Sequence, residues 1–171
     1  MAASKSRAPH IVVMGPMGVG KTTTGRALAD ALGWRYVDSD EDVQHVAAMS
    51  GRAYAERHGV PALHELEGKV LIDALSRDEP SVISAAASTI EVAEVRDRLR
   101  QRALIVRLTL PTGQTIRRQA AGEHRRAMTV DELERLTERR EPLFESIEDL
   151  RLAADGTTDE LVDEIRLHLD L

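Results

Sequence analysis

The chain has 171 residues, of which 42% are apolar and 30% are charged, a balance that is typical of one globular domain and not of a fibrous or disordered chain. It contains no cysteine, which excludes a disulfide scaffold and a thiolate metal site. Its 29 acidic and 23 basic residues give a net charge of −6, which argues against a broad nucleic-acid-binding surface.

No apolar run approaches the roughly 18 residues that are needed to cross a membrane. The segment before Pro9 is small, polar and partly basic, with no apolar stretch behind it that would make it a secretory signal. We therefore expect a cytoplasmic monomer that binds neither nucleic acid nor membrane, with residues 1–9 as a disordered tail.

Five short apolar runs along the chain are predicted to form β-strands. They are HIVVMG (10–15), WRYVDSD (34–40), PSVISAA (80–86), ALIVRLTL (103–110) and DLRLAAD (149–155). Segments of helical period separate them. This alternation predicts an α/β fold, with a five-stranded parallel sheet flanked by helices on both faces, and ligands bind such sheets beyond the carboxyl ends of the strands.

The first helix is expected in TTTGRALADALG, where Ala27, Leu28, Ala31 and Leu32 form an apolar stripe and Gly33 supplies a C-terminal cap. Later segments carry similar signals. Another apolar face is formed by Leu63, Leu66, Val70 and Ala74, and two capping boxes, Thr129 with Glu132 and Thr157 with Glu160, mark the starts of two further helices.

The segment GPMGVGKT (15–22), between the first strand and the first helix, matches the phosphate-binding pattern G-x-x-x-x-G-K-[ST] without a gap. In this motif the loop amides face the phosphates, the side chain of Lys21 reaches the outer phosphates, and the hydroxyl of Thr22 can ligate Mg²⁺. We therefore predict a P-loop nucleotide site with magnesium. Its expected nucleotide contacts are Gly15, Met17, Gly18, Val19, Gly20, Lys21, Thr22 and Thr23.

The second predicted strand ends in DSD, which places Asp38 and Asp40 at the same edge of the sheet. Strand side chains repeat every two residues, so both carboxylates are expected on one side. We expect Asp38 to join Thr22 in the magnesium shell, and Asp40 to orient an acceptor hydroxyl and take its proton. The alternative for Asp40 is a helix N-cap.

These features resemble the shikimate kinase family. The similar segments are GPMGVGKTTTGRALADALGWRYVDSD (15–40), SGRAYAERHGVPALHELEGKVL (50–71) and ERREPLFESIEDLRL (138–152), together with the basic lid that follows Arg117. The resemblance implies a nucleoside-monophosphate-kinase-like P-loop domain over residues 10–171, with a mobile lid at about 112–128. It also implies ATP-dependent transfer of a phosphoryl group to a hydroxyl of a small polyhydroxy acid.

The resemblance also implies roles for three arginines. Arg118 would stack on the adenine, and Arg125 would close over the transferring phosphate with Lys21 and Asp40 as the other catalytic residues. Arg140 interrupts an apolar helical stripe, where an arginine must find an anion, and it matches an arginine of the family that binds the carboxylate of shikimate. The alternative for Arg140 is a structural ion pair with Asp38 or Glu67. Glu67 itself matches an acid of the family pattern, and the alternative for it is a surface salt bridge.

The chain departs from the family pattern at two places in the expected acceptor site. Ala85, Ala86 and Ala87 stand where the family has three glycines, and His64 stands where it has an arginine that grips the carboxylate. The added methyl groups forbid a very close approach of ligand to backbone, and a histidine is mostly neutral at pH 7. We therefore expect a smaller or differently shaped acceptor pocket, with one anion contact weakened.

Two alternatives to a shikimate kinase remain open on the sequence. One is a gluconate-kinase-like enzyme that acts on a sugar acid. The other is a nucleotide-binding module that has lost its acceptor site. Asp40, Arg125 and Arg140 favour an enzyme, because a module that only senses ATP has no use for an acceptor base, whereas the alanine run favours a sensor or a new substrate.

Overall fold

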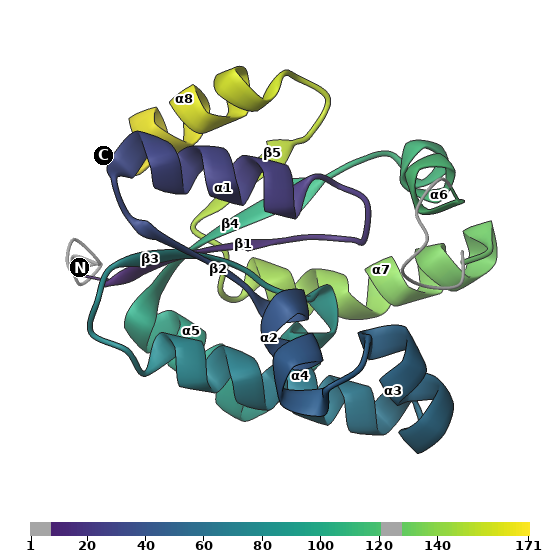
Figure 1. Cartoon of the computed structure of the whole chain (residues 1–171). Helices are drawn as coiled ribbons and strands as arrows, with labels where there is room; N and C mark the ends of the chain where they lie inside the picture. Colours follow the sequence, from purple (N-terminus) through teal and green to yellow (C-terminus); the bar gives the residue numbers. More distant parts are fainter. Residues whose placement is uncertain (1–7, 121–127) are drawn as a thin grey trace.

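A computed structural model describes residues 8–120 and 128–171 of the chain. Residues 1–7 of the expected tail, and residues 121–127 of the expected lid with Arg125, lie outside these ranges. The described residues contain one parallel sheet of five strands in the order β2-β3-β1-β4-β5 (Figure 1). The predicted fold class is thereby confirmed. The strands are β1 (His10–Met14), β2 (Arg35–Asp38), β3 (Ser81–Ser84), β4 (Ala103–Thr109) and β5 (Leu150–Ala153).

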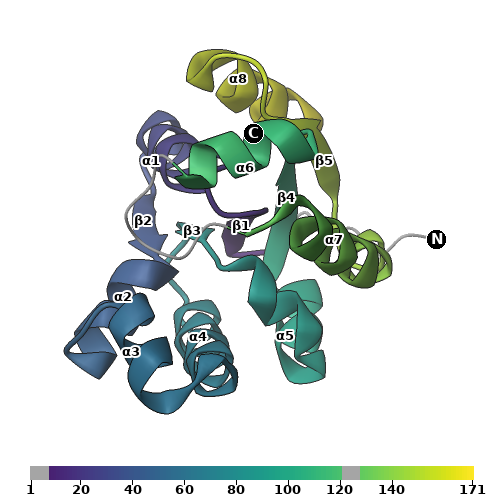
Figure 2. The same ribbon diagram turned by 90° about the vertical axis from the view of Figure 1, so that its right-hand side faces the viewer.

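Helices cover both faces of this sheet (Figures 1 and 2). One face packs against α1 and α8, and the other against α4, α5 and the end of α7. The helices in chain order are α1 (Lys21–Leu32), α2 (Ser39–Ala47), α3 (Gly51–His58), α4 (Val60–Leu75), the 3₁₀ helix η1 (Ala87–Glu91), α5 (Ala93–Arg102), α6 (Thr112–Ala120), α7 (Val130–Glu145) and α8 (Thr158–His168). No helix among them is long and apolar enough to span a membrane.

The two cores of the molecule meet at β1. Ile11 and Val13 belong to the core under α1 and α8, and Val12 and Met14 belong to the core on the opposite face; all four are 0% exposed. Successive side chains of a strand point to opposite faces, and a strand buried on both faces is an unbroken apolar run. This explains why HIVVM shows no polar alternation.

The apolar stripe that was predicted for α1 is only partly correct. Leu28 is buried as expected, but Ala31 is exposed, and Thr24 and Gly25 are buried instead. Small residues face the sheet here because α1 packs close to β3. The predicted cap is confirmed: Gly33 has a left-handed φ of 66°, and its N–H donates to carbonyl oxygens of the last turn.

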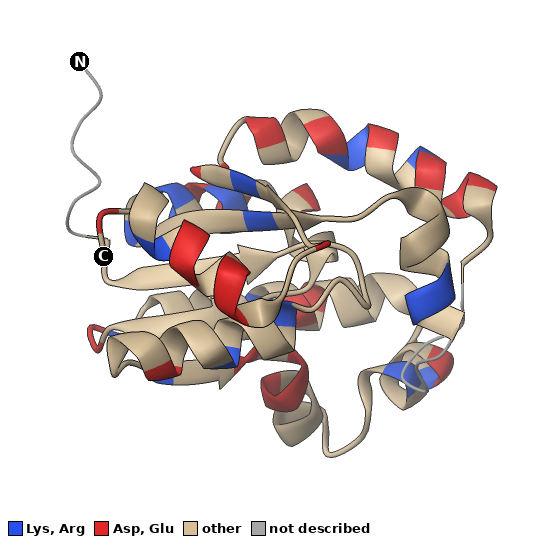
Figure 3. Cartoon of the chain, turned by 90° about the horizontal axis from the view of Figure 1, so that it is seen from above, with Lys and Arg blue, Asp and Glu red and all other residues tan. Residues whose placement is uncertain are grey.

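The other helix predictions agree better with the structure. On α4, Leu63, Val70 and Ala74 are buried and Leu66 is partly buried. Both predicted capping boxes are present: each threonine hydroxyl accepts from the N–H of the glutamate three residues later, and each glutamate caps the threonine N–H in return. Acidic and basic residues are interspersed along the helices (Figure 3).

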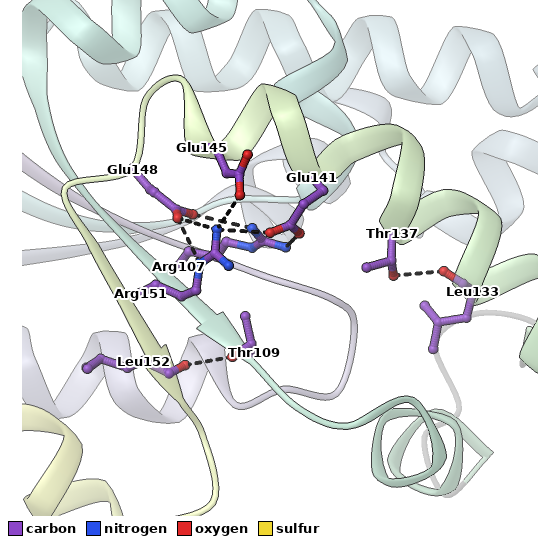
Figure 4. A network of polar contacts seen from close by, with 9 residues as sticks. All are labelled: Arg107, Thr109, Leu133, Thr137, Glu141, Glu145, Glu148, Arg151 and Leu152. Atoms are coloured by element: carbon purple, nitrogen blue, oxygen red, sulfur yellow. Dashed lines mark hydrogen bonds and ion pairs between the residues drawn. The ribbon is translucent and has the colours of Figure 1, made fainter.

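An ionic network attaches the last turn of α7 to β4 (Figure 4). Arg107, which is 6% exposed, donates to Glu141 at 2.5 Å and to Glu148 at 3.4 Å, and its guanidinium lies 4.4 Å from the ring centroid of Phe144. Arg151 on β5 pairs with the same two glutamates. The hydrogen bond from Arg107 lowers the pKa of Glu141. The orientation of α7 on the sheet is therefore held by charge as well as by packing.

A buried histidine lies at the opposite end of the sheet from the P-loop. The imidazole of His10 is 0% exposed, and its Nδ1 and Nε2 lie 2.8 Å from the hydroxyl of Ser81 and 2.9 Å from the carbonyl oxygen of Arg77. Nε2 must carry the proton that it donates to this carbonyl, so Nδ1 accepts from Ser81. Burial lowers the pKa of His10 below 6.5.

We expect His10 to make the protein less stable in mild acid. Below about pH 6.5, His10 becomes protonated in the unfolded chain, but its lowered pKa keeps it neutral in the folded protein. The free energy of unfolding therefore falls as the pH decreases. Thermal unfolding between pH 7.5 and 5.5 checks this, at roughly 2–4 °C for each kcal/mol lost. His10→Gln should show a shallower slope with pH, and His168→Gln, at an exposed position of α8, should keep the slope of the unmodified protein. Equal slopes for all three proteins would contradict the assignment.

Candidate active site

The P-loop leaves the carboxyl end of β1 and leads directly into α1. A side chain at Gly15 would place its Cβ 2.4 Å from the backbone oxygen of Leu108, so no other residue fits there. Gly20 instead has open space around it but a φ of 105°, which only glycine adopts readily. It is the N-cap of α1 and provides no side-chain cap. The first amides of the helix are therefore available to a phosphate group.

The ammonium group of Lys21 lies against the P-loop. Its Nζ donates to the carbonyl oxygen of Gly15 at 2.9 Å and to that of Pro16 at 3.1 Å. An ammonium group on a flexible four-carbon stem can exchange such carbonyl partners for phosphate oxygens. The structure thus places Lys21 against the P-loop, and its contact with the outer phosphates stays a prediction.

Thr22, Tyr36 and Asp38 form a polar cluster beside the loop. The hydroxyl of Thr22 donates to Oδ2 of Asp38 at 3.1 Å. The hydroxyl of Tyr36 lies 3.1 Å from the same oxygen and 2.9 Å from Oγ of Ser84, so its single proton is shared between them. Burial raises the pKa of Tyr36, which keeps this hydroxyl neutral. Ser84 in turn donates to the backbone oxygen of Lys21 at 3.0 Å.

This cluster has the donor set of a magnesium site. Hydroxyl and carboxylate oxygens are the ligands that Mg²⁺ prefers, and it commonly takes one or two protein oxygens together with phosphates and water. Thr22 and Asp38 supply two such oxygens at the mouth of the P-loop. Within residues 8–120 and 128–171, no group of three or more His, Asp or Glu side chains could hold a metal by itself, so a bound metal would depend on phosphate oxygens.

The arrangement of the DSD segment differs from the expected one. The strand ends at Asp38, and Asp38, not Asp40, is the N-cap of α2, accepting from the N–H of Asp40 at 2.9 Å. Asp40 lies in the first helical turn and is exposed. The prediction that a shared strand places both carboxylates on one side is therefore wrong, because the cap ends the strand first. The two residues are nevertheless joined at the carboxyl end of β2.

The alanine run follows β3 at the same edge of the sheet. Ala85 is buried, and its N–H donates to the carbonyl oxygen of Val13 at 3.1 Å. Ala86 has a φ of −64° and a ψ of 137°, and all three alanines have negative φ angles. The backbone of this segment is thus one that any residue can adopt. Alanines in place of glycines therefore add methyl groups here without straining the backbone.

A buried carboxylate lies next to this run. Glu67 of α4 is 0% exposed and accepts a short hydrogen bond from the hydroxyl of Ser88. Glu67 is therefore not at the surface, where the salt-bridge alternative placed it. His64 lies one turn earlier on the same helix and is half-buried. The hydrogen bond from Ser88 to Glu67 thus joins the segment after β3 to α4.

Arg140 projects from α7 toward the end of η1. Its Nε donates to Oε1 of Glu91 at 2.7 Å, and Arg139 donates to the same oxygen at 2.8 Å. The partner is thus Glu91, where the sequence suggested Asp38 or Glu67 as alternatives; Glu67 contributes a longer-range attraction. Burial lowers the pKa of Arg140, and Glu91 opposes this change. Burial would raise the pKa of Glu91, but the hydrogen bonds from the two arginines hold it below its ordinary value.

Helix α6 lies over the P-loop. Arg118 donates to the carbonyl oxygens of Gly18 at 3.5 Å and Val19 at 3.3 Å, and the amide of Gln119 donates to Met17 at 3.3 Å. The structure therefore places Arg118 in contact with carbonyl groups of the P-loop, and its stacking on adenine stays a prediction. The expected lid arginine, Arg125, lies outside the described residues.

Sequence reasoning missed four residues of this region. Tyr36 and Ser84 were counted only as strand residues, Gln119 as part of a lid, and Glu91 not at all. Their only signal in the sequence is that they stand at or near the carboxyl end of a predicted strand or beside a predicted site residue. Such a position predicts that a residue lies near the site, but not which residue it contacts there.

Comparisons with known proteins agree with this geometry. A family model described as shikimate kinase matches residues 17–170. A shikimate kinase of Corynebacterium efficiens is 32% identical over 168 residues, which cover 95% of this chain and 97% of that protein. The structure of a shikimate kinase from Acinetobacter baumannii in complex with shikimate superposes with a TM-score of 0.88 at 28% identity, covering 96% of this chain and 95% of that one. The corresponding enzyme from Aquifex aeolicus gives a TM-score of 0.82 at 26% identity, covering 94% and 96% of the two chains.

The cluster at Ser84 gives a specific expectation for Gly25 of α1. A Cβ at this position would lie 2.7 Å from Oγ of Ser84 and 2.9 Å from the ring of Tyr36. Gly25→Ala should therefore displace one of them and lower the free energy of unfolding by about 1–3 kcal/mol, measured by chemical denaturation. The control is Gly113→Ala on α6, where a Cβ meets nothing within 4 Å, and this change should be neutral or stabilising. Equal stability of the two variants would contradict the close packing of α1 on β3.

Proposed function

The chain belongs to the shikimate kinase family, whose members are ATP-dependent kinases, and we propose that its acceptor is shikimate itself. The observation that carries the proposal is the meeting of three groups at one edge of the sheet. The P-loop follows β1, the Thr22–Asp38 pair lies at the end of β2, and the segment after β3 ends at the carboxylate that holds Arg140. A nucleotide, a metal and an anionic acceptor thereby have adjacent binding groups. That the relative from Acinetobacter baumannii binds shikimate supports the same acceptor.

On the nucleotide side, the backbone of the P-loop and the start of α1 hold the phosphate chain of ATP, with contributions from Gly15, Met17, Gly18, Val19, Gly20 and Thr23. Lys21 turns from the loop carbonyls to the outer phosphates. Thr22 and Asp38 would hold Mg²⁺, which would supply positive charge beside the phosphates. Arg118, on the helix over the loop, borders the nucleotide.

On the acceptor side, Asp40 accepts the proton of the attacking hydroxyl. The hydroxyl oxygen forms a bond to the γ-phosphorus, the bond from that phosphorus to the bridging oxygen breaks, and ADP leaves with the electron pair. Arg125 stabilises the charge of the transferring group. Arg140 binds the carboxylate of the acceptor, and His64 and the alanine segment at 85–87 border it.

The first experiment measures release of ADP from ATP and Mg²⁺ with shikimate, with gluconate and without an acceptor. We expect shikimate alone to accelerate release, because the relatives that match nearly the whole chain are shikimate kinases. The anion contact at Arg140 would fit the carboxylate of either compound. Acceleration by gluconate instead would assign the enzyme to sugar acids. If neither compound accelerates release while ATP still binds, shikimate is not the acceptor.

Asp40→Asn should leave the affinity for ATP within about twofold of the unmodified protein and lower kcat on the order of a hundredfold or more, as loss of a general base does. Steady-state kinetics and titration with ATP check the two effects separately. Asp42→Asn is the matched control, because it removes the same charge from the same turn of α2 and should keep kcat. A collapse of ATP affinity in Asp40→Asn would show that Asp40 is a metal ligand or a structural residue.

A further inference from the structure

Glu91 holds the arginine of the proposed acceptor site by one specific nitrogen. The carboxylate oxygen Oε1 accepts from Nε of Arg140 at 2.7 Å. Among the residues that the structure describes, no other hydrogen bond to this guanidinium is found. Within the described residues, the terminal nitrogens Nη1 and Nη2 therefore remain available together for a ligand. The side chain of Arg140 is 12% exposed.

This choice of nitrogen matters for an anionic ligand. A guanidinium is a planar fork, and its two terminal nitrogens match the two oxygens of a carboxylate. A carboxylate bound to Nη1 and Nη2 would compete with the ligand, whereas one bound at Nε fixes the rotation of the plane and leaves that pair available. Glu91 lies on the side of the guanidinium that a terminal bidentate ligand does not use.

Glu91 is itself fixed from a second direction. Arg139 donates to the same oxygen at 2.8 Å, and the two pairs together join the end of η1 to α7. The two arginines and one glutamate carry a net charge of +1, so the cluster keeps a positive charge after Glu91 is paired. Glu91 is 28% exposed, against 12% for the side chain of Arg140, so the carboxylate reaches solvent while the arginine is largely buried.

We propose that Glu91 is a positioning residue for acceptor binding: it holds Arg140 by Nε and directs the terminal nitrogen pair toward the carboxylate of the acceptor. The inference rests on the proposed function, in which Arg140 binds that carboxylate. It adds that acceptor affinity depends on a residue of η1 that need not touch the acceptor. The opposite role, in which Glu91 competes with the acceptor for Arg140, predicts effects of the opposite sign.

The test compares Glu91→Ala, Glu91→Gln and the control Glu94→Ala, which removes an exposed acid in the first turn of α5. Glu91→Ala should raise KM and Kd for shikimate about tenfold, as expected for loss of a charged hydrogen bond. The values of kcat and of KM for ATP should stay within about twofold. Glu91→Gln keeps an oxygen that accepts from Nε, so it should recover most of the lost affinity. Glu94→Ala should match the unmodified protein.

The methyl ester of shikimate separates positioning from a general loss of structure. It lacks the carboxylate charge, so its binding should not depend on how Arg140 is directed, and its Kd should be the same for the unmodified protein and for Glu91→Ala. Titration calorimetry measures both ligands without turnover. An equal loss for acid and ester would assign Glu91 a merely structural role and overturn the proposal.

Two further outcomes also decide the matter. A lower KM for shikimate in both Glu91 variants would show that Glu91 competes for Arg140, and would overturn the positioning role while leaving the acceptor unchanged. Absence of shikimate binding to the unmodified protein would remove the proposed acceptor and this inference together. Failure of the two proposals is therefore distinguishable, because only the second outcome is seen in the unmodified protein.

Discussion

Burial of β1 on both faces is the constraint on which the rest of the molecule depends. Its side chains enter two separate cores, so both faces of the sheet must be covered, which parallel strands achieve through helical crossovers. Every crossover returns the chain to the same end of the sheet, and all carboxyl ends then point one way. Since β1 is the central strand and β3 and β2 follow on one side, the loops after these three strands meet at one edge. The candidate site residues lie at this edge because the loops that carry them follow these three neighbouring strands.

Features that depend on a few consecutive residues could be predicted from the sequence. The P-loop pattern specified its own conformation at Gly20, where a positive φ requires glycine. Gly33 and the capping box at Thr129 formed as predicted for the same reason, since their hydrogen bonds join neighbouring residues. The strands were found because runs of Val and Ile, buried on both faces, are hard to place elsewhere.

Features that depend on distant segments could not be predicted. The partner of Arg140 comes from a short 3₁₀ helix 49 residues away, and no local pattern marks Glu91 as an anchor. Glu67 looks like a surface acid in an amphipathic helix, yet it is buried and accepts a hydrogen bond from the hydroxyl of Ser88. In α1, the choice between Ala31 and Gly25 was decided by how closely the helix approaches β3, and small residues carry little hydrophobic signal either way. Local sequence thus predicted where the site is, and tertiary contacts determined how its charges are paired.

The pairing of β1 with β3 has a consequence for the tolerance of the enzyme to change. Val13 of β1 is in register with Ser84 of β3, so the P-loop and the alanine segment leave the sheet from adjacent strands, which in any sheet are about 4.8 Å apart. The hydrogen bonding between β1 and β3 fixes the distance between the starting points of the two loops. Insertions farther along either loop can reshape a pocket without altering this starting separation. A lineage of such proteins could therefore exchange one acceptor for another while the distance between donor and acceptor loops stays constant.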